Sequence, residues 1–173
     1  MPIKFMRAVL LCTLMLALTG CIFSRKSLFD ISKGATDIPV GRFELRSAAD
    51  KSSIQVARHG NLYLYGDDKS LEKAILSFHA IGDGFYLATA ILPGGPIHYG
   101  VLNARSKDKL PFALLECTST TPPDLVPAPD ADAFERCNAA DPERLIAIAN
   151  RYKADMMAGR IPASKLFQYT RIP

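Results

Sequence analysis

Three histidines, His59, His79 and His98, are the residues of this chain best suited to acid–base catalysis or metal binding. They lie about twenty residues apart, a spacing that matches no common set of metal ligands. His79 and His98 also fall on opposite faces of the strands predicted below, so we do not expect them to share a site. The sequence therefore predicts partially exposed structural histidines, with no metal site and no catalytic residue among them.

Other residues with chemical potential also lack the arrangement that a reaction would need. Asp67 and Asp68 are adjacent, so on a strand their carboxylates point apart, and both suit a turn better than an acid–base pair. The glycines at 82–84 and 94–95 connect predicted strands, whereas a phosphate-binding loop leads into a helix. No serine lies in a nucleophile-elbow pattern. We predict a protein that is not an enzyme and that holds no cofactor.

The N-terminus has the plan of an export signal. Lys4 and Arg7 precede an apolar run, residues 8–18, which is interrupted only by Thr13. This run is too short to cross a bilayer as a helix, since crossing needs about 20 apolar residues. A removable signal peptide is therefore favoured over a permanent membrane anchor.

The apolar run ends in Leu18, Thr19, Gly20 and Cys21, and this segment resembles the lipobox of bacterial lipoproteins. The resemblance implies cleavage between Gly20 and Cys21, a diacylglyceryl group on the Cys21 thiol and a further acyl chain, such as palmitate, on the new N-terminus. Several chains are needed because one gives only marginal membrane binding. In enterobacterial lipoproteins an aspartate after the lipidated cysteine retains the protein in the inner membrane, so Ile22 at this position implies the outer membrane, facing the periplasm. Display on a Gram-positive cell is the alternative. The alternative is a secreted protein whose cleavage site contains a cysteine by chance.

The length of the remaining chain fits one ordinary domain, and its charge is nearly balanced. Removal of the signal peptide, residues 1–20, leaves about 150 residues. We expect residues 21–38 to form a lipidated tether, because they mix charged residues, serine and glycine, and residues 39–173 to form a single domain. The chain has 21 Lys and Arg against 17 Asp and Glu, and loss of Lys4 and Arg7 leaves 19 against 17. We therefore expect no nucleic-acid partner.

The four cysteines of the chain have separate expected fates. Cys12 leaves with the signal and Cys21 receives lipid, so Cys117 and Cys137 remain. An exported chain meets an oxidising compartment, which favours a disulfide between these two. Closing a loop of about twenty residues stabilises the fold by about 3 kcal/mol. A thiol nucleophile or metal ligand would need a reduced thiolate and an adjacent base, which nothing here indicates.

Alternation of apolar and polar residues predicts β-strands through most of the domain. The expected strands cover residues 43–47, 54–56, 62–65, 74–81, 85–92, 97–104, 110–117 and 166–171. His59 and Gly60 are expected to form one hairpin turn. Asp83 and Gly84 are expected to form another, in which Ala80 lies opposite Leu87.

A proline-rich connector and a helix follow the strands. Residues 118–129 contain four prolines and should run over the surface, held by the disulfide. Asp141 followed by Pro142 is typical of a helix start, and apolar residues then recur at helical spacing up to Gly159. The predicted fold class is α+β: an antiparallel, curved or barrel-like meander of about six to eight strands with one main C-terminal helix.

Tyrosines on the predicted strands allow two interpretations. Tyr63, Tyr65, Tyr86 and Tyr99 could form a binding surface, since tyrosine combines contact area with a hydroxyl group. They could instead pack beneath the C-terminal helix through Tyr152, which is the interpretation we favour.

The predicted function is a lipid-anchored protein of the cell envelope that binds without catalysing a reaction. By analogy from architecture, it would act as an adaptor or inhibitor with an envelope protein or a glycan as partner. Two alternatives are an envelope hydrolase that places His79 or His98 beside a carboxylate, and a purely structural spacer.

Overall fold

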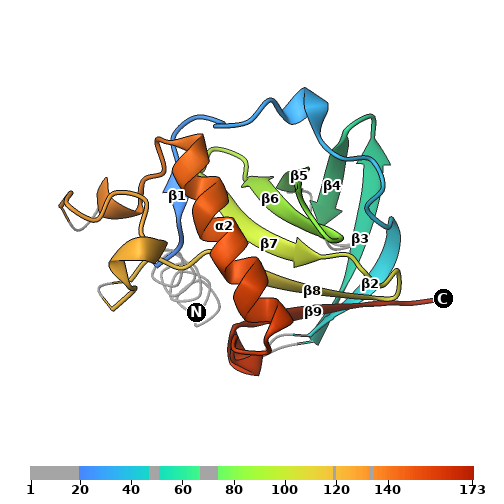
Figure 1. The fold of residues 1–173 in the computed structure, drawn as a ribbon. Coiled ribbons are helices and arrows are strands. Elements are labelled where there is room, and N and C mark those ends of the chain that lie inside the picture. Colours follow the sequence, from blue (N-terminus) through green and yellow to red (C-terminus); the bar gives the residue numbers. More distant parts are fainter. Residues whose placement is uncertain (1–19, 47–50, 67–73, 119, 133–134) are drawn as a thin grey trace, which may run out of the picture.

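The structure is a computed structural model that describes residues 20–46, 51–66, 74–118, 120–132 and 135–173. The described residues form nine strands and one α-helix (Figure 1). The strands are β1 (Phe23–Ser24), β2 (Gly41–Arg46), β3 (Lys51–His59), β4 (Leu62–Gly66), β5 (Ala74–Gly82), β6 (Phe85–Ile91), β7 (Ile97–Asn103), β8 (Lys109–Leu114) and β9 (Phe167–Arg171). The helix is α2 (Pro142–Met157), and short 3₁₀ turns cover Ile31–Lys33, Pro123–Leu125, Glu135–Cys137 and Ala163–Lys165. The expected signal sequence up to Thr19, Ser47, Asp67 and Asp68 lie outside the described residues.

Eight of these strands close into an antiparallel barrel. From β2 to β8 each strand pairs with the next along the chain, and β9 lies between β8 and β2. Tyr169 on β9 shows the closure, because it lies opposite Leu45 of β2 on one side and Leu110 of β8 on the other. The predicted α+β class, a barrel-like antiparallel meander with one main C-terminal helix, is confirmed.

Two hydrophobic cores follow from the alternation of side chains along the barrel strands. The inner rows meet inside the barrel in a core of buried residues that contains Ile38, Phe43, Ile54, Tyr63, Phe78, Tyr86, Ala88, Leu102 and Leu110. The outer rows of β6 and β7 instead face α2. There Leu87 and Val101 pack with Leu145 and Ile148 of the helix in a second core.

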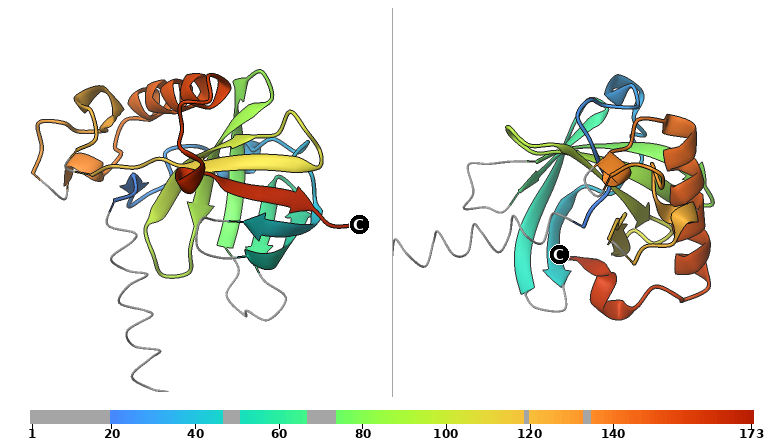
Figure 2. Two further views of the ribbon diagram at one scale, coloured as in Figure 1. Left: turned by 90° about the horizontal axis from the view of Figure 1, so that it is seen from below. Right: turned by 90° about the vertical axis from the view of Figure 1, so that its left-hand side faces the viewer.

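Helix α2 forms as the sequence predicts and covers one side of the barrel (Figure 2). Asp141 is the N-cap, and its carboxylate accepts a hydrogen bond from the backbone N–H of Glu143. Near the other end of the helix, Lys153 donates to the carbonyl oxygen of Ile81 at 3.0 Å and pairs with Asp83 at 2.7 Å. These contacts attach the helix to the β5–β6 hairpin.

The β5–β6 hairpin has the predicted turn but a different register. Asp83 and Gly84 both have positive φ angles, 55° and 72°, as a two-residue type I′ turn requires. Ala80 lies opposite Tyr86, however, so the predicted pairing with Leu87 is wrong by one residue. A bulge between Ala80 and Gly82 inserts one extra residue into β5 and shifts every later pair.

In the β3–β4 hairpin the turn lies one residue later in the chain than the sequence predicts. His59 ends β3 and pairs with Leu62, so Gly60 and Asn61 form the turn. Gly60 supplies the positive φ of 62°. His59 is therefore an exposed strand residue beside the turn and not part of it.

The strand tyrosines divide between the two cores. Tyr63, Tyr65 and Tyr86 belong to the inner side of the barrel. Tyr99 lies on the helix side, where Tyr152 also packs. The favoured interpretation, packing beneath the helix, therefore holds for Tyr99 and is wrong for the other three.

Residues 21–38 pack on the barrel, which corrects the expectation that they form a free tether. β1 pairs with the start of β7, and Ile22 is fully buried in the helix-side core. The Ser24 and Tyr99 hydroxyl groups are hydrogen-bonded at 2.7 Å. Ile38 is buried inside the barrel, and its N–H donates to the Tyr63 hydroxyl oxygen at 3.2 Å. Apolar residues spaced irregularly through this segment give it enough buried surface to remain attached.

A disulfide joins Cys117 to Cys137, the pair that the sequence predicts. The connector between them lies beyond the N-terminal end of α2 (Figure 2). Its proline-rich part includes the turn Pro123–Leu125, and Val126 is fully buried in the helix-side core. Arg144 of α2 holds this part by donating to the carbonyl oxygen of Val126 at 3.0 Å.

Candidate functional site

The barrel interior contains an apolar cavity of about 250 Å³ that is partly open to the outside. Its wall consists of inward-facing side chains from all eight barrel strands and from the segment before β2. The lining residues are Ile38, Pro39, Phe43, Leu45, Val56, Tyr65, Ala74, Leu76, Phe78, Ala88, Ala90, Leu92, His98, Leu102, Leu110, Phe112, Leu114, Phe167 and Tyr169. An eight-stranded barrel can either fill its interior with side chains or hold one small ligand, and here part of the interior is left unfilled.

Small inward-facing residues on β6 and β7 explain why this space remains. Ala88, Ala90 and Gly100 occupy inner positions of these two strands, whereas most inner positions of the other strands carry Val, Ile, Leu, Phe or Tyr. The ring of Phe112 lies directly against Gly100 and takes up part of the space that a side chain would fill. This run of small residues at alternate positions is the signal in the sequence that could have indicated a cavity.

The two ends of the barrel are filled differently. The end that carries the β5–β6 hairpin, here called the β5–β6 end, is filled by Ile38 and large aromatic residues. The Tyr86 hydroxyl there donates to the Asp37 carboxylate at 2.7 Å. Burial, together with this hydrogen bond, raises the pKa of Tyr86 to about 12. Tyr86 therefore keeps its proton and holds the segment before β2 over this end.

The cavity extends toward the opposite end, which carries the β6–β7 hairpin and is here called the β6–β7 end. Leu92 follows β6, Leu114 ends β8 and Phe167 begins β9, and all three line the cavity and are partly exposed. On the same wall the rings of Tyr65 and Tyr169 are nearly perpendicular, with centroids 6.2 Å apart and hydroxyl oxygens 3.5 Å apart. Burial raises the pKa of both tyrosines, so both are uncharged.

Among the described lining residues, His98 is the one with a nitrogen-containing side chain. It lies on β7 opposite Ala90 with only 4% of its surface exposed, so the expectation of a partially exposed histidine is wrong for this residue. Its ring nitrogen Nδ1 is buried and has no hydrogen-bond partner among the described residues. Burial lowers the pKa of His98, so the imidazole is neutral near pH 7. A neutral imidazole can donate one hydrogen bond and accept another.

The structure does not bring the three histidines together. His79 lies on the outer face of β5, where its ring stacks on Phe29 with centroids 5.1 Å apart. His98 lies inside the barrel, on the opposite face of the sheet, as the sequence predicts. His59 is exposed at the end of β3. Within the described ranges no group of His, Cys, Asp and Glu side chains is arranged to hold a metal ion.

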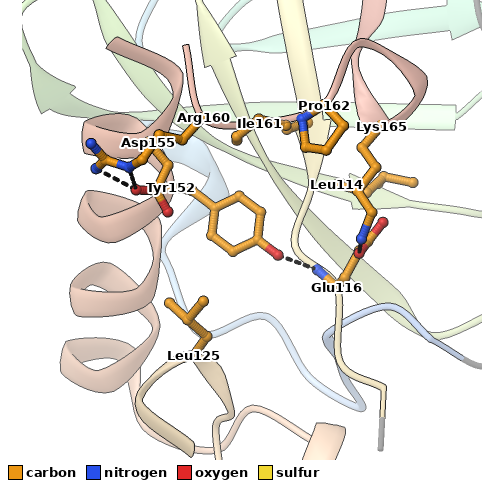
Figure 3. Close-up of a pocket in the computed structure, with 10 residues that line it drawn as sticks. Leu114, Glu116, Leu125, Tyr152, Asp155, Arg160, Ile161, Pro162 and Lys165 are labelled. Carbon is orange, nitrogen blue, oxygen red and sulfur yellow. Dashed lines mark hydrogen bonds and ion pairs between the residues drawn. The ribbon is translucent and has the colours of Figure 1, made fainter. Parts of the chain in front are cut away.

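A second, smaller pocket of about 160 Å³ lies on the outside, between α2 and the chain that follows β8 (Figure 3). The Tyr152 hydroxyl accepts a hydrogen bond from the backbone N–H of Glu116 at 3.0 Å, and the Glu116 carboxylate pairs with Lys165. Asp155 pairs with Arg160, whose Nε donates at 2.8 Å. The charged side chains of this pocket thus pair with one another, which leaves the barrel interior as the better candidate site.

Cys21 lies at the β6–β7 end of the barrel. Its backbone forms an isolated antiparallel β-bridge with Glu116, two residues beyond the end of β8. Only 6% of its surface is exposed. Burial raises the pKa of its thiol. The preceding Gly20 accepts a hydrogen bond from the N–H of Cys117. The residue expected to carry lipid and the cavity are therefore at the same end of the molecule.

Comparison with known proteins adds no relative. No protein-family model, no curated protein and no solved structure matches this chain. Among the helices of the described segments, none has both the length and the apolar character needed to cross a membrane. The closed barrel with a partly empty apolar interior is thus the feature on which a functional proposal must rest.

Proposed function

We propose that this protein is a lipid-anchored envelope protein that holds the apolar chain of an amphipathic molecule inside its barrel. The observation that supports the proposal is the apolar cavity of about 250 Å³. A dry cavity of about 150 Å³ lined by aliphatic and aromatic residues is enough to bind benzene. Each methylene group that leaves water for such a site contributes about 0.8 kcal/mol. This proposal gives the non-enzymatic binding role expected from the sequence a specific location.

The chemistry of the wall favours an apolar chain over a glycan. A sugar would bring several hydroxyl groups into the cavity, and each would need a polar partner to offset its loss of hydration. Beyond His98 and the hydroxyl groups of Tyr65 and Tyr169, the side chains of the lining residues are hydrocarbon. A ligand with one long apolar part therefore fits this wall, with no covalent chemistry required.

Lipid on Cys21 would place the cavity next to the source of such a ligand. Cys21 and the cavity lie at the same end of the barrel, so anchoring at Cys21 would hold that end near the membrane. Because Cys21 is almost fully buried here, acylation of its thiol requires residues 20–24 to be undocked from the barrel. We therefore propose that lipid attachment precedes the final docking of β1.

Substitution of one cavity residue tests the binding proposal. Ala90 lines the cavity and is partly exposed, so phenylalanine in its place should fill much of the space. The full chain is purified in amphipol, and its thermal unfolding is followed by circular dichroism with increasing amounts of the hydrocarbon undecane. A ligand that binds only the folded state raises the unfolding temperature. We expect undecane to stabilise the wild type and to have little effect on Ala90→Phe.

The matched control is Ala57→Phe, since Ala57 is exposed on the outer face of β3. This variant should respond to undecane like the wild type. An equal response of Ala90→Phe, or no response of the wild type, would contradict binding in the cavity.

The proposed anchor is tested separately in cells. Radiolabelled palmitate should enter the wild-type chain and not Cys21→Ser, and membrane fractionation should recover the labelled chain with the outer membrane. Label that enters Cys21→Ser to the same extent would refute the proposed lipid site.

A further inference from the structure

We propose that His98 hydrogen-bonds a hydroxyl group of the bound molecule, which makes the ligand a single-chain lipid with a free hydroxyl. This inference rests on the proposed function and names the ligand class for the same cavity. It starts from the Nδ1 atom of His98, which is buried without a hydrogen-bond partner among the described residues. A buried polar atom without a hydrogen bond destabilises the fold. Such an atom in the apolar wall of a cavity therefore indicates that a polar group of the ligand pairs with it.

The described tyrosines of the barrel interior each take part in at least one hydrogen bond. The hydroxyl groups of Tyr65 and Tyr169 face each other at 3.5 Å. Tyr63 accepts from the N–H of Ile38, and Tyr86 donates to Asp37. Nδ1 of His98 is thus the lining side-chain atom that is buried with no hydrogen bond at all among the described residues.

The chemistry of a neutral imidazole selects a hydroxyl group over a carboxylate. A hydroxyl both donates and accepts, so it pairs with Nδ1 whichever ring nitrogen carries the proton. A carboxylate would be buried as an ion opposite an uncharged ring, and burial of an incompletely paired charge is strongly unfavourable. The desolvation that lowers the pKa of His98 keeps the ring in this uncharged form.

The position of His98 also sets the direction of the ligand. His98 is the second residue of β7 and therefore lies near the β6–β7 end. A hydroxyl group held there leaves the apolar chain to extend inward, past Gly100, toward Ile38 and Leu102. The polar end of the ligand would then lie at the end of the barrel that also carries Cys21.

The test compares decanol with undecane, a hydrocarbon with the same number of heavy atoms, on the full chain in amphipol. Apparent affinities come from the rise in unfolding temperature with ligand concentration. His98→Leu keeps an apolar wall and removes the hydrogen bond. We expect this variant to bind decanol about two- to twelvefold more weakly than the wild type, the range that one hydrogen bond provides, and to bind undecane unchanged. His79→Leu, the same substitution on the outer face of β5, should leave both affinities unchanged.

The possible outcomes separate this inference from the proposed function. One outcome is that undecane binds all three proteins and that decanol binds His98→Leu as tightly as the wild type. This outcome would overturn the role of His98 and leave the cavity proposal standing. Decanoate that depends on His98 while decanol does not would replace the hydroxyl with a carboxylate and overturn the proposed ligand class. If no ligand stabilises the wild type, both proposals fail.

Discussion

The substitution Gly100→Ala tests the structural basis of the cavity, because position 100 has no room for even a methyl group. A Cβ atom built on Gly100 would overlap the ring of Phe112 and lie 2.8 Å from the carbonyl oxygen of Ala113. The ring could turn into the cavity, but the Ala113 carbonyl belongs to the β7–β8 pairing and must shift with its strand. Overpacking of this kind costs about 1–3 kcal/mol. We expect Gly100→Ala to destabilise the full chain by about 2 kcal/mol.

Thermal unfolding followed by circular dichroism measures this effect. At about 2–4 °C per kcal/mol for a domain of this size, the unfolding temperature of Gly100→Ala should fall by about 4–8 °C. A Phe112 ring displaced into the cavity should also weaken the response to undecane. The control is Gly95→Ala in the β6–β7 hairpin, where the added Cβ would meet its nearest atom at 3.5 Å. We expect less than about 0.5 kcal/mol from that change.

A second substitution tests whether contact with the Phe112 ring causes the loss of stability in Gly100→Ala. Phe112→Leu removes the distal ring atoms that the new Cβ would meet, so it should recover part of the stability lost in Gly100→Ala. The double-mutant cycle should therefore show coupling between the two positions. Unchanged stability of Gly100→Ala, or strictly additive effects of the two changes, would refute the packing of Phe112 against Gly100 and with it our explanation of the cavity.

Two further predictions concern the stability of the whole fold. The double variant Cys117→Ala/Cys137→Ala should be about 3 kcal/mol less stable than the oxidised wild type, and dithiothreitol should lower the unfolding temperature of the wild type alone; a variant as stable as the oxidised protein would be inconsistent with this role. At high pH, Tyr86 keeps its proton to about pH 12 in the folded chain, whereas an unfolded tyrosine loses it near pH 10. Deprotonation therefore favours unfolding between these values, and stability should fall as the pH rises from about 10 to about 12. Tyr86→Phe should make this fall smaller, as measured by urea unfolding at each pH, and an identical pH profile would contradict the assignment.

Local features of this protein could be predicted from its sequence because neighbouring residues determine them. Asp141 and Pro142 define the start of α2 through the cap and the first turn, and both act within a few residues. Asp83 and Gly84 define a hairpin turn for the same reason. The disulfide between Cys117 and Cys137 followed from the oxidising compartment expected for an exported chain and from the expected fates of the other cysteines.

Features that depend on distant pairings could not be predicted in the same way. Alternation shows that a strand has two faces but not which face the barrel will enclose, so Tyr63 and Tyr65 were expected near the helix and lie inside. One extra residue at Ile81 moved the β5–β6 register, because a shift of one position changes every later pair. Residues 21–38 lacked a regular apolar period, yet Ile22 and Ile38 attach them to two different cores.

The sequence by itself determined the strands, the helix, the disulfide pair and the lipobox-like segment that ends in Cys21. Only the tertiary structure decided that β9 would pair with both β8 and β2, since the β9–β2 pairing that closes the barrel joins residues more than a hundred positions apart. Closure turns one face of the sheet into an enclosed interior. The small residues on β6 and β7 then leave space there, and Nδ1 of His98 becomes a buried atom in an apolar wall with no hydrogen-bond partner among the described residues.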